Sequence, residues 1–453
     1  MTKKWLEQTT LLISITKWTL YASILGAIVG GCTVLFLTLL NNAITMLQAL
    51  PYPFLLAPAA LVASKLLIDK LAPEAAGYGT DRLIAAVQEK NGQVPLRVVP
   101  VKLIASILTI TAGGSAGKIG PCGQIGAGLA SSIANNLKID TIDKKKLVVC
   151  GISAGFAAVL GTPVGGALFG AEVLFLGRLL YEVLFPAFIA GLTAYQIANL
   201  CGIPYFYQKI ETAAALSGWN VLQCILLGIL CGLTALFFIE SLEFVKNRFA
   251  DRKSSLLQPI SGGLLLILLG WFVSPDYLGL SMNTIQQSLQ GLILAPYAFL
   301  AKIIATSITF AAGGSGGIIL PTLFIGSAAG NLFAQILGGN HLAFFAAIGM
   351  VALLAAATNT PIASTVIAME LFGPAIAPYA AVACAVSYLA IGHNSIFPTQ
   401  VLATRKSASL EIATGKPIQA IHDVVIHPHG SFWKILFYRL HLIKHPSPPK
   451  DNR

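Results

Sequence analysis

The sequence predicts an all-α polytopic membrane protein, built as an inverted repeat of two helical halves whose broken helices meet near the membrane midplane. Three observations carry this prediction. Of the 453 residues, 56% are hydrophobic and only 10% are charged, whereas soluble domains average about 25% charged residues. Apolar stretches long enough to cross a bilayer recur along the whole chain. A Gly-rich stretch at 113–126 returns at 313–326, which indicates an internal duplication.

The two Gly-rich stretches read GGSAGKIGPCGQIG and GGSGGIILPTLFIG. In each copy an apolar run ends, a Gly-rich break follows, and a new helix begins near a proline, which suits the first turn of a helix. Broken helices at matching places in two repeats indicate a transport site, and free N–H groups at a helix N-terminus favour an anion. The alternative is that the glycines only allow close helix packing. Two matched copies, each with a proline, favour the anion site.

The first elements follow from hydropathy and local breaks. Residues 1–16 are expected to form a short N-terminal cytoplasmic or interfacial helix, and 17–47 a long apolar helix. A charge-free link, 48–54, leads to a second helix that ends near Lys70. Thr80 or Asp81 is expected to N-cap the short helix that follows.

The rest of the first half contains the first Gly-rich break and a charged segment, 138–147, which is expected to be a cytoplasmic loop. Two apolar runs follow, separated by Gly161-Thr162-Pro163. Arg178 and Glu182 stand four residues apart and are expected to form a local ion pair. The first membrane repeat is therefore assigned to 17–202, with a connecting segment at 203–218.

The second half repeats this order, and the second membrane repeat is assigned to 219–402. The first link, 48–54, is uncharged, whereas its counterpart at 246–253 carries several lysines and arginines. The positive-inside rule then places the two links on opposite sides, so the repeats are inverted. The N-terminus and the basic tail, 403–453, are expected to be cytoplasmic. Scattered histidines in that tail (His422, His427, His429, His441 and His445) are expected to be solvated, so no metal is assigned.

Composition excludes several functions. The net charge of +11 arises from short inter-helix segments and tails, which fits membrane topology and not nucleic-acid binding. No nucleotide-binding loop, metal-ligand cluster or nucleophile arrangement stands out, so neither an enzyme nor a cofactor is expected. The cysteines form no CxxC pair and are expected to pack in apolar surroundings: Cys32, Cys122, Cys150, Cys201, Cys224, Cys231 and Cys384.

Together these motifs resemble the CLC family of chloride channels and proton/chloride antiporters. The family's Gly-Arg/Lys-Glu-Gly-Pro motif stands here as Gly117-Lys118-Ile119-Gly120-Pro121, and its Gly-x-Phe-x-Pro motif as Gly317-Ile318-Ile319-Leu320-Pro321. Further matches are Gly77 to Asp81, the Pro163–Glu172 segment, and the stretch before Phe397. The resemblance implies a homodimer with one pore per subunit, embedded in the lipid of a bacterial-type inner membrane, with chloride or a similar small anion as its partner.

Two departures from the family pattern concern protons. The resemblance places the family's gating glutamate at Ile119 and the antiporters' inner proton-transfer glutamate at Val173. Neither isoleucine nor valine carries a charge or titrates. Both proton-handling carboxylates are therefore expected to be missing.

The expected anion donors change as well. The resemblance places the family's serine at Tyr78. The Tyr78 hydroxyl can still donate to an anion; the alternative is that Tyr78 is an interfacial or packing residue. The family's tyrosine falls at Phe397, which cannot donate. Backbone N–H groups of Ile318 and Ile319, and those near Gly120, are then expected to hold the anion.

Each of three charged residues has two possible roles, one functional and one structural. Lys118 either raises the local anion concentration or extends to an interface. Glu172 and Glu370 are intramembrane carboxylates, which mark function by default. They occupy equivalent places in the two repeats, and this symmetry favours structural pairing with nearby polar groups.

The leading hypothesis is a passive, chloride-conducting channel that is not coupled to protons. The alternative is an anion/proton antiporter with an atypical proton path, for instance through Glu172. A second alternative is a non-conducting regulatory homologue whose pore is plugged by Ile119.

Overall fold

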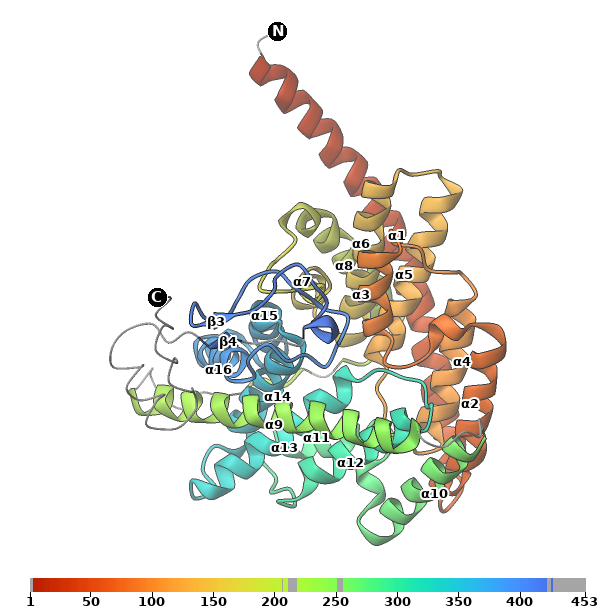
Figure 1. Cartoon of the computed structure of the whole chain (residues 1–453), viewed down its shortest axis with the longest axis vertical. Helices are drawn as coiled ribbons and strands as arrows, with labels where there is room; N and C mark the ends of the chain where they lie inside the picture. Colours follow the sequence, from red (N-terminus) through yellow and green to blue (C-terminus); the bar gives the residue numbers. More distant parts are fainter. Residues whose placement is uncertain (1–2, 206, 211–217, 251–255, 422–424, 427–453) are drawn as a thin grey trace, which may run out of the picture.

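The computed structural model describes residues 3–205, 207–210, 218–250, 256–421 and 425–426. Its helices follow the predicted order in two sets (Figure 1). The first half contains α1 (Lys3–Leu47), α2 (Ala57–Leu71), α3 (Thr80–Glu89), α4 (Val98–Thr111), α5 (Ile119–Asn136), α6 (Thr141–Leu160), α7 (Pro163–Glu172) and α8 (Tyr181–Leu200). The second half contains α9 (Gly218–Ala250), α10 (Leu257–Phe272), α11 (Met282–Leu289), α12 (Ala298–Ala311), α13 (Ile319–Ile336), α14 (Leu342–Thr358), α15 (Pro361–Phe372) and α16 (Ala377–Ala390).

Short elements complete the chain. The 3₁₀ turns are η1 (Pro53–Leu56), η2 (Pro73–Ala75), η3 (Pro275–Tyr277), η4 (Pro374–Ile376) and η5 (Ile418–Ala420). The strands pair β1 (Phe175–Leu176) parallel with β2 (Val401–Leu402), and β3 (Leu410–Glu411) antiparallel with β4 (Val425–Ile426). The first of these pairs joins the segment after α7 to the segment after α16, so the chain's final membrane region is tied back to the first repeat.

The two halves correspond helix for helix, which confirms the predicted repeat. α5 packs on α6 as α13 packs on α14, and α1 packs on α8 as α9 packs on α16. α7 and α15 pack directly against each other. In Figure 1 the first half, red to olive, lies mostly above the second half, green to blue.

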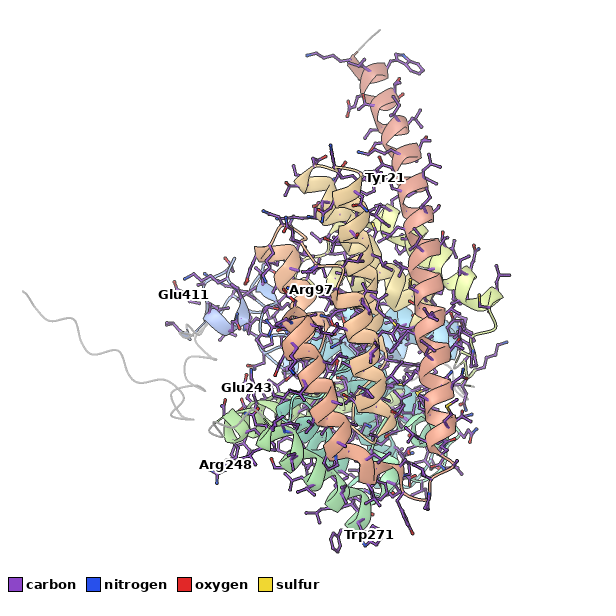
Figure 2. All side chains as sticks on the ribbon, turned by 90° about the vertical axis from the view of Figure 1, so that its right-hand side faces the viewer. Tyr21, Arg97, Glu243, Arg248, Trp271 and Glu411 are labelled. Atoms are coloured by element: carbon purple, nitrogen blue, oxygen red, sulfur yellow. The ribbon has the colours of Figure 1, made fainter. Side chains whose placement is uncertain are left out.

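The surface suits a lipid environment. Four helices within the described residues are long and apolar enough to span a bilayer: Lys3–Leu47, Tyr181–Leu200, Gly218–Phe249 and Ile319–Ile336. On α9, one helix face is exposed and apolar, with members three to seven residues apart: Leu222, Leu226, Ile229, Leu233, Phe237 and Phe244. Figure 2 places Trp271 at the end of the molecule opposite the N-terminus of α1. A tryptophan there matches the aromatic belts of membrane interfaces.

The predicted separate helix at 1–16 is wrong, because α1 runs without a break from Lys3 to Leu47. No Gly or Pro interrupts the sequence before Gly26, so nothing ends the helix. Its first turns project beyond the rest of the molecule (Figure 1).

The predicted loop at 138–147 is mostly helix. α6 begins at Thr141, and Asp140 is its N-cap, with the carboxylate accepting hydrogen bonds from the N–H groups of Ile142 and Asp143 at 2.9 and 3.0 Å. These two bonds satisfy donors that the first turn leaves free.

Two local predictions are wrong. α3 has Gly79 as its N-cap with no side-chain capping bond, so neither Thr80 nor Asp81 caps it. Among the described residues Arg178 makes no ion pair with Glu182. Arg178 precedes α8 and lies 5.5 Å from the ring centre of Phe175, so helical i,i+4 geometry does not apply. The five tail histidines lie outside the described residues.

Candidate functional site

The two Gly-rich breaks meet at the centre of the molecule. Gly117 and Gly317 exchange two backbone hydrogen bonds, with N–H to O=C distances of 2.6 and 2.7 Å. α5 and α13 begin two residues later, after Lys118 and Ile318. The pair therefore sets two helix N-termini side by side.

A reciprocal set of hydroxyls fixes this meeting point. The Thr109 hydroxyl oxygen accepts from the Ser315 N–H at 3.0 Å, and the Thr309 hydroxyl oxygen accepts from the Ser115 N–H at 2.9 Å. Each threonine lies on the helix before the break of its own repeat and binds the backbone of the break in the other repeat. The two breaks are therefore fixed relative to each other.

A third segment reaches the same place. A Cβ on Gly120 would lie 2.6 Å from the Tyr78 carbonyl oxygen and 2.8 Å from the Gly317 Cα, so only glycine fits there. Gly79, at φ 84°, also lies close to Gly120: a Cβ on Gly79 would lie 3.1 Å from the Gly120 carbonyl oxygen. The loop before α3 thus packs directly on the start of α5.

The start of each central helix presents free donors. In the part of the chain that the structure describes, the N–H groups of Ile119, Gly120, Ile318 and Ile319 have no hydrogen-bond acceptor. Such groups carry the partial positive charge of the helix end. Their convergence makes this spot a suitable seat for an anion.

The side chains around these donors are apolar. Ile119, Ile318, Ile319 and Leu320 are all buried. Pro121 occupies the first turn of α5, and its Cδ lies 3.1 Å from a Cβ placed on Gly317; Pro321 takes the same place in α13. Lys118 is half-buried and takes part in no ion pair among the described residues.

Tyr78 and Phe397 lie on the side of α3 and of the segment after α16, which we call the inner side. The half-buried Tyr78 ring packs edge-on against Phe310, with ring centres 4.7 Å apart. Phe397 is fully buried. Thr399, two residues later, donates its N–H and its hydroxyl to the Asp81 carboxylate at 3.1 and 2.7 Å. This clamp holds the Phe397 segment against α3.

Val173 ends α7 as its C-cap and is buried. Its carbonyl accepts a hydrogen bond from the Gln400 side chain at 2.9 Å. Gln400 also donates to the Thr358 carbonyl at 3.0 Å, and its amide oxygen accepts from Asn359 at 3.0 Å. An uncharged amide network thus holds the Val173 carbonyl. The Glu172 carboxylate is next to it in the chain, and the Lys406 ammonium donates to the Asn359 amide oxygen at 2.6 Å.

Glu172 and Glu370 are reciprocal helix caps. The Glu172 carboxylate accepts from the N–H groups of Ile362 and Ala363, at 3.2 and 2.7 Å, at the start of α15. The Glu370 carboxylate accepts from Val164 and Gly165, at 3.0 and 2.7 Å, at the start of α7. This exchange between the repeats agrees with the structural pairing inferred from their symmetry.

Sequence reasoning missed two buried cations. Lys102 and Lys302 are fully buried. The Lys102 ammonium donates to the carbonyls of Ala75 and Gly77, and the Lys302 ammonium to those of Tyr277 and Gly279, all at 2.8–3.1 Å. Each lysine thereby fixes the loop before α3 or α11. The two lysines occupy equivalent positions in the two repeats, and this equivalence was the sequence feature that could have revealed them. The sequence alone did not show that they are buried.

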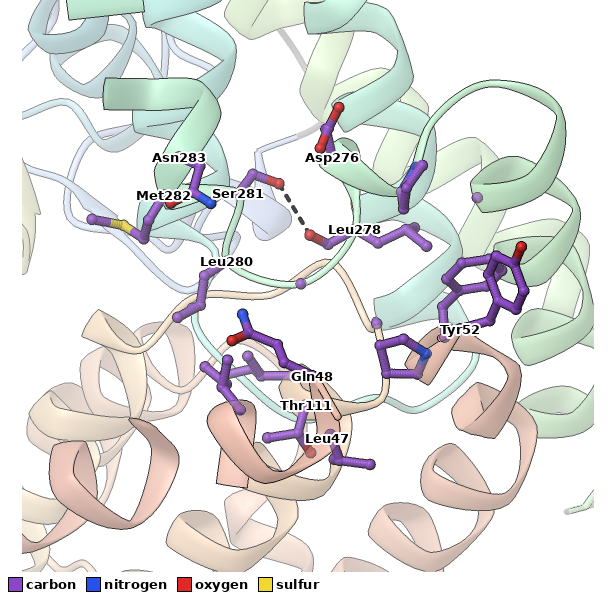
Figure 3. Close-up of a pocket in the computed structure, with 18 of the residues that line it drawn as sticks. Leu47, Gln48, Tyr52, Thr111, Asp276, Leu278, Leu280, Ser281, Met282 and Asn283 are labelled. Atoms are coloured by element: carbon purple, nitrogen blue, oxygen red, sulfur yellow. Dashed lines mark hydrogen bonds between the residues drawn. The ribbon is translucent and has the colours of Figure 1, made fainter. Parts of the chain in front are cut away.

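One cavity reaches Gly113 at the first break, and a second lies around Glu172. The larger, about 640 Å³, is lined by the end of α1, the 110–113 turn and residues 270–284, with Asp276 as its sole charged lining residue in the described part. Figure 3 shows its wall, where the Ser281 hydroxyl donates to the Leu278 carbonyl at 3.1 Å. The smaller, about 480 Å³, contains Glu172, Arg178 and Glu182 on the inner side.

Comparisons with known proteins agree with this geometry. The family model described as voltage gated chloride channel matches residues 59–392. A chloride/fluoride channel protein of Pseudomonas syringae pv. tomato is 37% identical over 87% of this chain and 88% of its own length. The voltage-gated ClC-type chloride channel ClcB of Escherichia coli is 30% identical over 77% of this chain and 85% of its own length.

The crystal structure of a CLC-type fluoride/proton antiporter superposes with a TM-score of 0.80 at 27% identity, covering 86% of this chain and 98% of that one. A slow cyanobacterial chloride/proton antiporter, at 22% identity, shares the fold with a TM-score of 0.73. The helix order, the paired breaks and these matches lead to one conclusion: the chain belongs to the voltage gated chloride channel family, the CLC family.

Proposed function

We propose that this chain is a passive, chloride-conducting anion channel that does not couple anion flux to protons. The observation that carries the proposal is Ile119, the first residue of α5, buried beside the free N–H groups of two helices. An isoleucine has no charge, so it cannot compete with an anion for these donors. It also has no titratable group, so it cannot carry a proton past them.

The inner side supports the same proposal. A proton that crosses a low-dielectric interior needs groups that bind and release it. Val173 and its neighbour Gln400 offer none. An anion could pass while a proton finds no relay at either of these positions.

In this proposal the anion rests mainly on backbone. The N–H groups of Ile318, Ile319 and Gly120 hold it, the Gly117–Gly317 pair fixes their geometry, and Lys118 raises the local anion concentration. A site with few side-chain donors binds its ion weakly enough to release it, as conduction requires. Chloride and fluoride, named for the Pseudomonas relative, are the anions to test first.

The second candidate is an anion/proton antiporter. Glu172 lines the inner cavity together with Glu182, and the chain resembles a fluoride/proton antiporter. A third candidate is a plugged homologue, favoured by the burial of Ile119 to 1% exposure. Proton movement separates the first two candidates, and any flux at all excludes the third.

We further propose a homodimer with one pore per subunit in a bacterial inner membrane, with both termini cytoplasmic. The family relation supports the assembly and the membrane. The lysines at positions 3 and 4 and the basic tail support the orientation.

The test is efflux from liposomes that contain the purified protein, with chloride and external pH recorded together. Chloride release without a pH change supports the channel. Uphill proton movement driven by chloride would establish the antiporter, and absence of flux would establish the plugged homologue.

A further inference from the structure

The larger cavity includes Trp271, which lies at the end of the molecule opposite the N-terminus of α1 (Figure 2). Its walls come from the end of α1, from η1 and from the 275–284 segment, which runs from η3 into α11. Its volume of about 640 Å³ is within the range of small-molecule sites, about 300–1,000 Å³. Lys118, Ile119 and Ile319 do not line it, so this cavity is separate from the candidate anion site.

The lining combines apolar walls with a few polar groups. Ile44, Leu47 and Phe54 are among the apolar members. Gln48 and Thr111 are among the polar ones, and Figure 3 shows both at the cavity. Small-molecule sites usually have this composition, because a few polar groups orient a ligand whose surface is buried mainly against apolar side chains. An occupant is therefore expected to have an apolar body and a polar head group.

The charge of the lining selects the head group. Asp276 is the sole charged lining residue in the described part of the chain, and it takes part in none of the ion pairs found there. Its Oδ2 atom accepts a hydrogen bond from the Ser274 hydroxyl at 2.9 Å, while its Oδ1 atom has no donor among the described residues. One carboxylate oxygen is thus available, and it favours a cationic head group over an anionic one.

Two aromatic side chains line the same cavity. The ring centres of Tyr52 and Trp271 are 5.4 Å apart, and both side chains are exposed. The face of an aromatic ring attracts an organic cation electrostatically, and it also packs on an apolar body. The two rings therefore add to the preference for a cation.

Hydrogen bonds from behind fix the wall that follows η3. The buried Lys302 ammonium, which does not line the cavity, donates to the Gly279 carbonyl at 2.9 Å and to the Ser281 hydroxyl oxygen at 2.8 Å. The Ser281 hydroxyl donates in turn to the Leu278 carbonyl at 3.1 Å (Figure 3). Because this wall is already ordered, a ligand loses little free energy in ordering it.

We propose that this cavity binds a small amphipathic cation, with its ammonium group on the Asp276 carboxylate and its apolar body against Tyr52 and Trp271. The inference goes beyond the proposed function and does not depend on it, because binding is measured without anion flux. A neutral molecule of the same shape gains the apolar contacts alone. An anion of the same shape is repelled by the carboxylate.

The experiment titrates three probes of similar shape, phenethylammonium, phenethyl alcohol and phenylacetate, into the purified full-length protein in nanodiscs of zwitterionic lipid. Empty nanodiscs correct for partition of each probe into lipid. Asp276→Asn removes the charge and keeps the shape, and Trp271→Leu removes one aromatic ring. Glu240→Gln is the matched control, because Glu240 is an exposed carboxylate on α9 that does not line the cavity.

We expect wild type to bind phenethylammonium about fivefold more tightly than phenethyl alcohol, as for one exposed charge pair, and phenylacetate more weakly still. Asp276→Asn should lose this fivefold preference, while its affinity for phenethyl alcohol stays within about twofold of wild type. Trp271→Leu should weaken phenethylammonium binding by about twofold or more, and Glu240→Gln should match wild type. If Asp276→Asn does not fold, Asp276→Ser is titrated instead and must show the same loss.

Equal affinity of wild type and Asp276→Asn for phenethylammonium overturns the inference, and so does phenylacetate binding as tight as that of phenethylammonium. An equal loss in Glu240→Gln would show that the overall surface charge attracts the cation, and it overturns the inference as well. Wild-type protein that binds no phenethylammonium overturns it directly, whatever its anion flux.

Discussion

At the scale of single residues, the proposed function makes its sharpest prediction at position 119. A carboxylate introduced by Ile119→Glu would lie at the start of α5, where a helix N-terminus stabilises negative charge by up to about 2 kcal/mol in partly buried geometry. It would compete with the permeant anion until it is protonated. Flux through Ile119→Glu should therefore be low at neutral pH and rise as pH falls, while wild-type flux stays nearly flat.

Efflux measured across a pH series checks this prediction, with Ile119→Gln as the control that has similar size and no titration. Full proton coupling should not return, because Val173 still offers no inner station. An Ile119→Glu protein that folds, assembles like wild type and conducts with unchanged rate and pH dependence would show that residue 119 does not face the anion.

The two glutamate caps give a second prediction at this scale. Glu172→Gln and Glu370→Gln each replace a charged acceptor of two N–H groups by a neutral one. Each should lower stability by about 1–3 kcal/mol, and the two should behave alike because their contacts are equivalent. Thermal unfolding in detergent and liposome flux measure the two effects. A loss of proton movement with Glu172→Gln alone, at unchanged stability, would identify Glu172 as a proton station.

At the scale of helices, the start of α6 depends on one carboxylate. The N–H groups of Asp143 and Ile142 hold the pKa of the Asp140 carboxyl below its ordinary value. Because the pKa of Asp140 is lowered in the folded protein, its cap contributes fully to stability above the pKa of the unfolded chain, about 3.9. This contribution to stability is lost as pH falls through the lower pKa of the folded state.

Asp140→Asn tests the point, since asparagine caps a helix but does not titrate. Its melting temperature should change less than that of wild type between about pH 5 and pH 3, and Asp140→Ala should melt a few degrees lower at neutral pH, on the order expected for a lost cap. Equal acid sensitivity of wild type and Asp140→Asn would show that Asp140 does not contribute.

Helix order and the two breaks could be predicted because they depend on local sequence. Hydropathy, glycines and prolines fix where α5 and α13 begin. The missed features depend on distant partners. Asp81 resembles an N-cap in sequence, but Thr399, more than three hundred positions away, takes its carboxylate. The exchange of Glu172 and Glu370 between repeats likewise requires the packed fold.

The continuity of α1 shows a different limit. A boundary was predicted between residues 16 and 17, but no glycine or proline there ends the helix. At the candidate site, motif matching found the residues that bring the three backbone segments together. It did not show the roles of Lys102 and Lys302, which depend on burial and on carbonyl partners in the packed fold.

At the scale of the whole molecule, the family relation predicts a homodimer. Brief amine-reactive crosslinking of the purified protein in mild detergent should yield a dimer band, and dilution of the protein should not abolish it. A control in denaturing detergent should return the single chain. Recovery of monomer alone in mild detergent would contradict the assembly.

The central claim is that anions cross without protons, and the potential of zero net chloride flux tests it most directly. Liposomes containing the protein are prepared with a tenfold chloride gradient, and potassium with valinomycin sets the membrane voltage. A channel gives zero net chloride flux at the chloride equilibrium potential, about 59 mV for a tenfold gradient of a monovalent ion. An additional pH gradient should leave this zero-flux potential unchanged. A zero-flux potential that lies below this value and shifts when the pH gradient is changed would contradict the account.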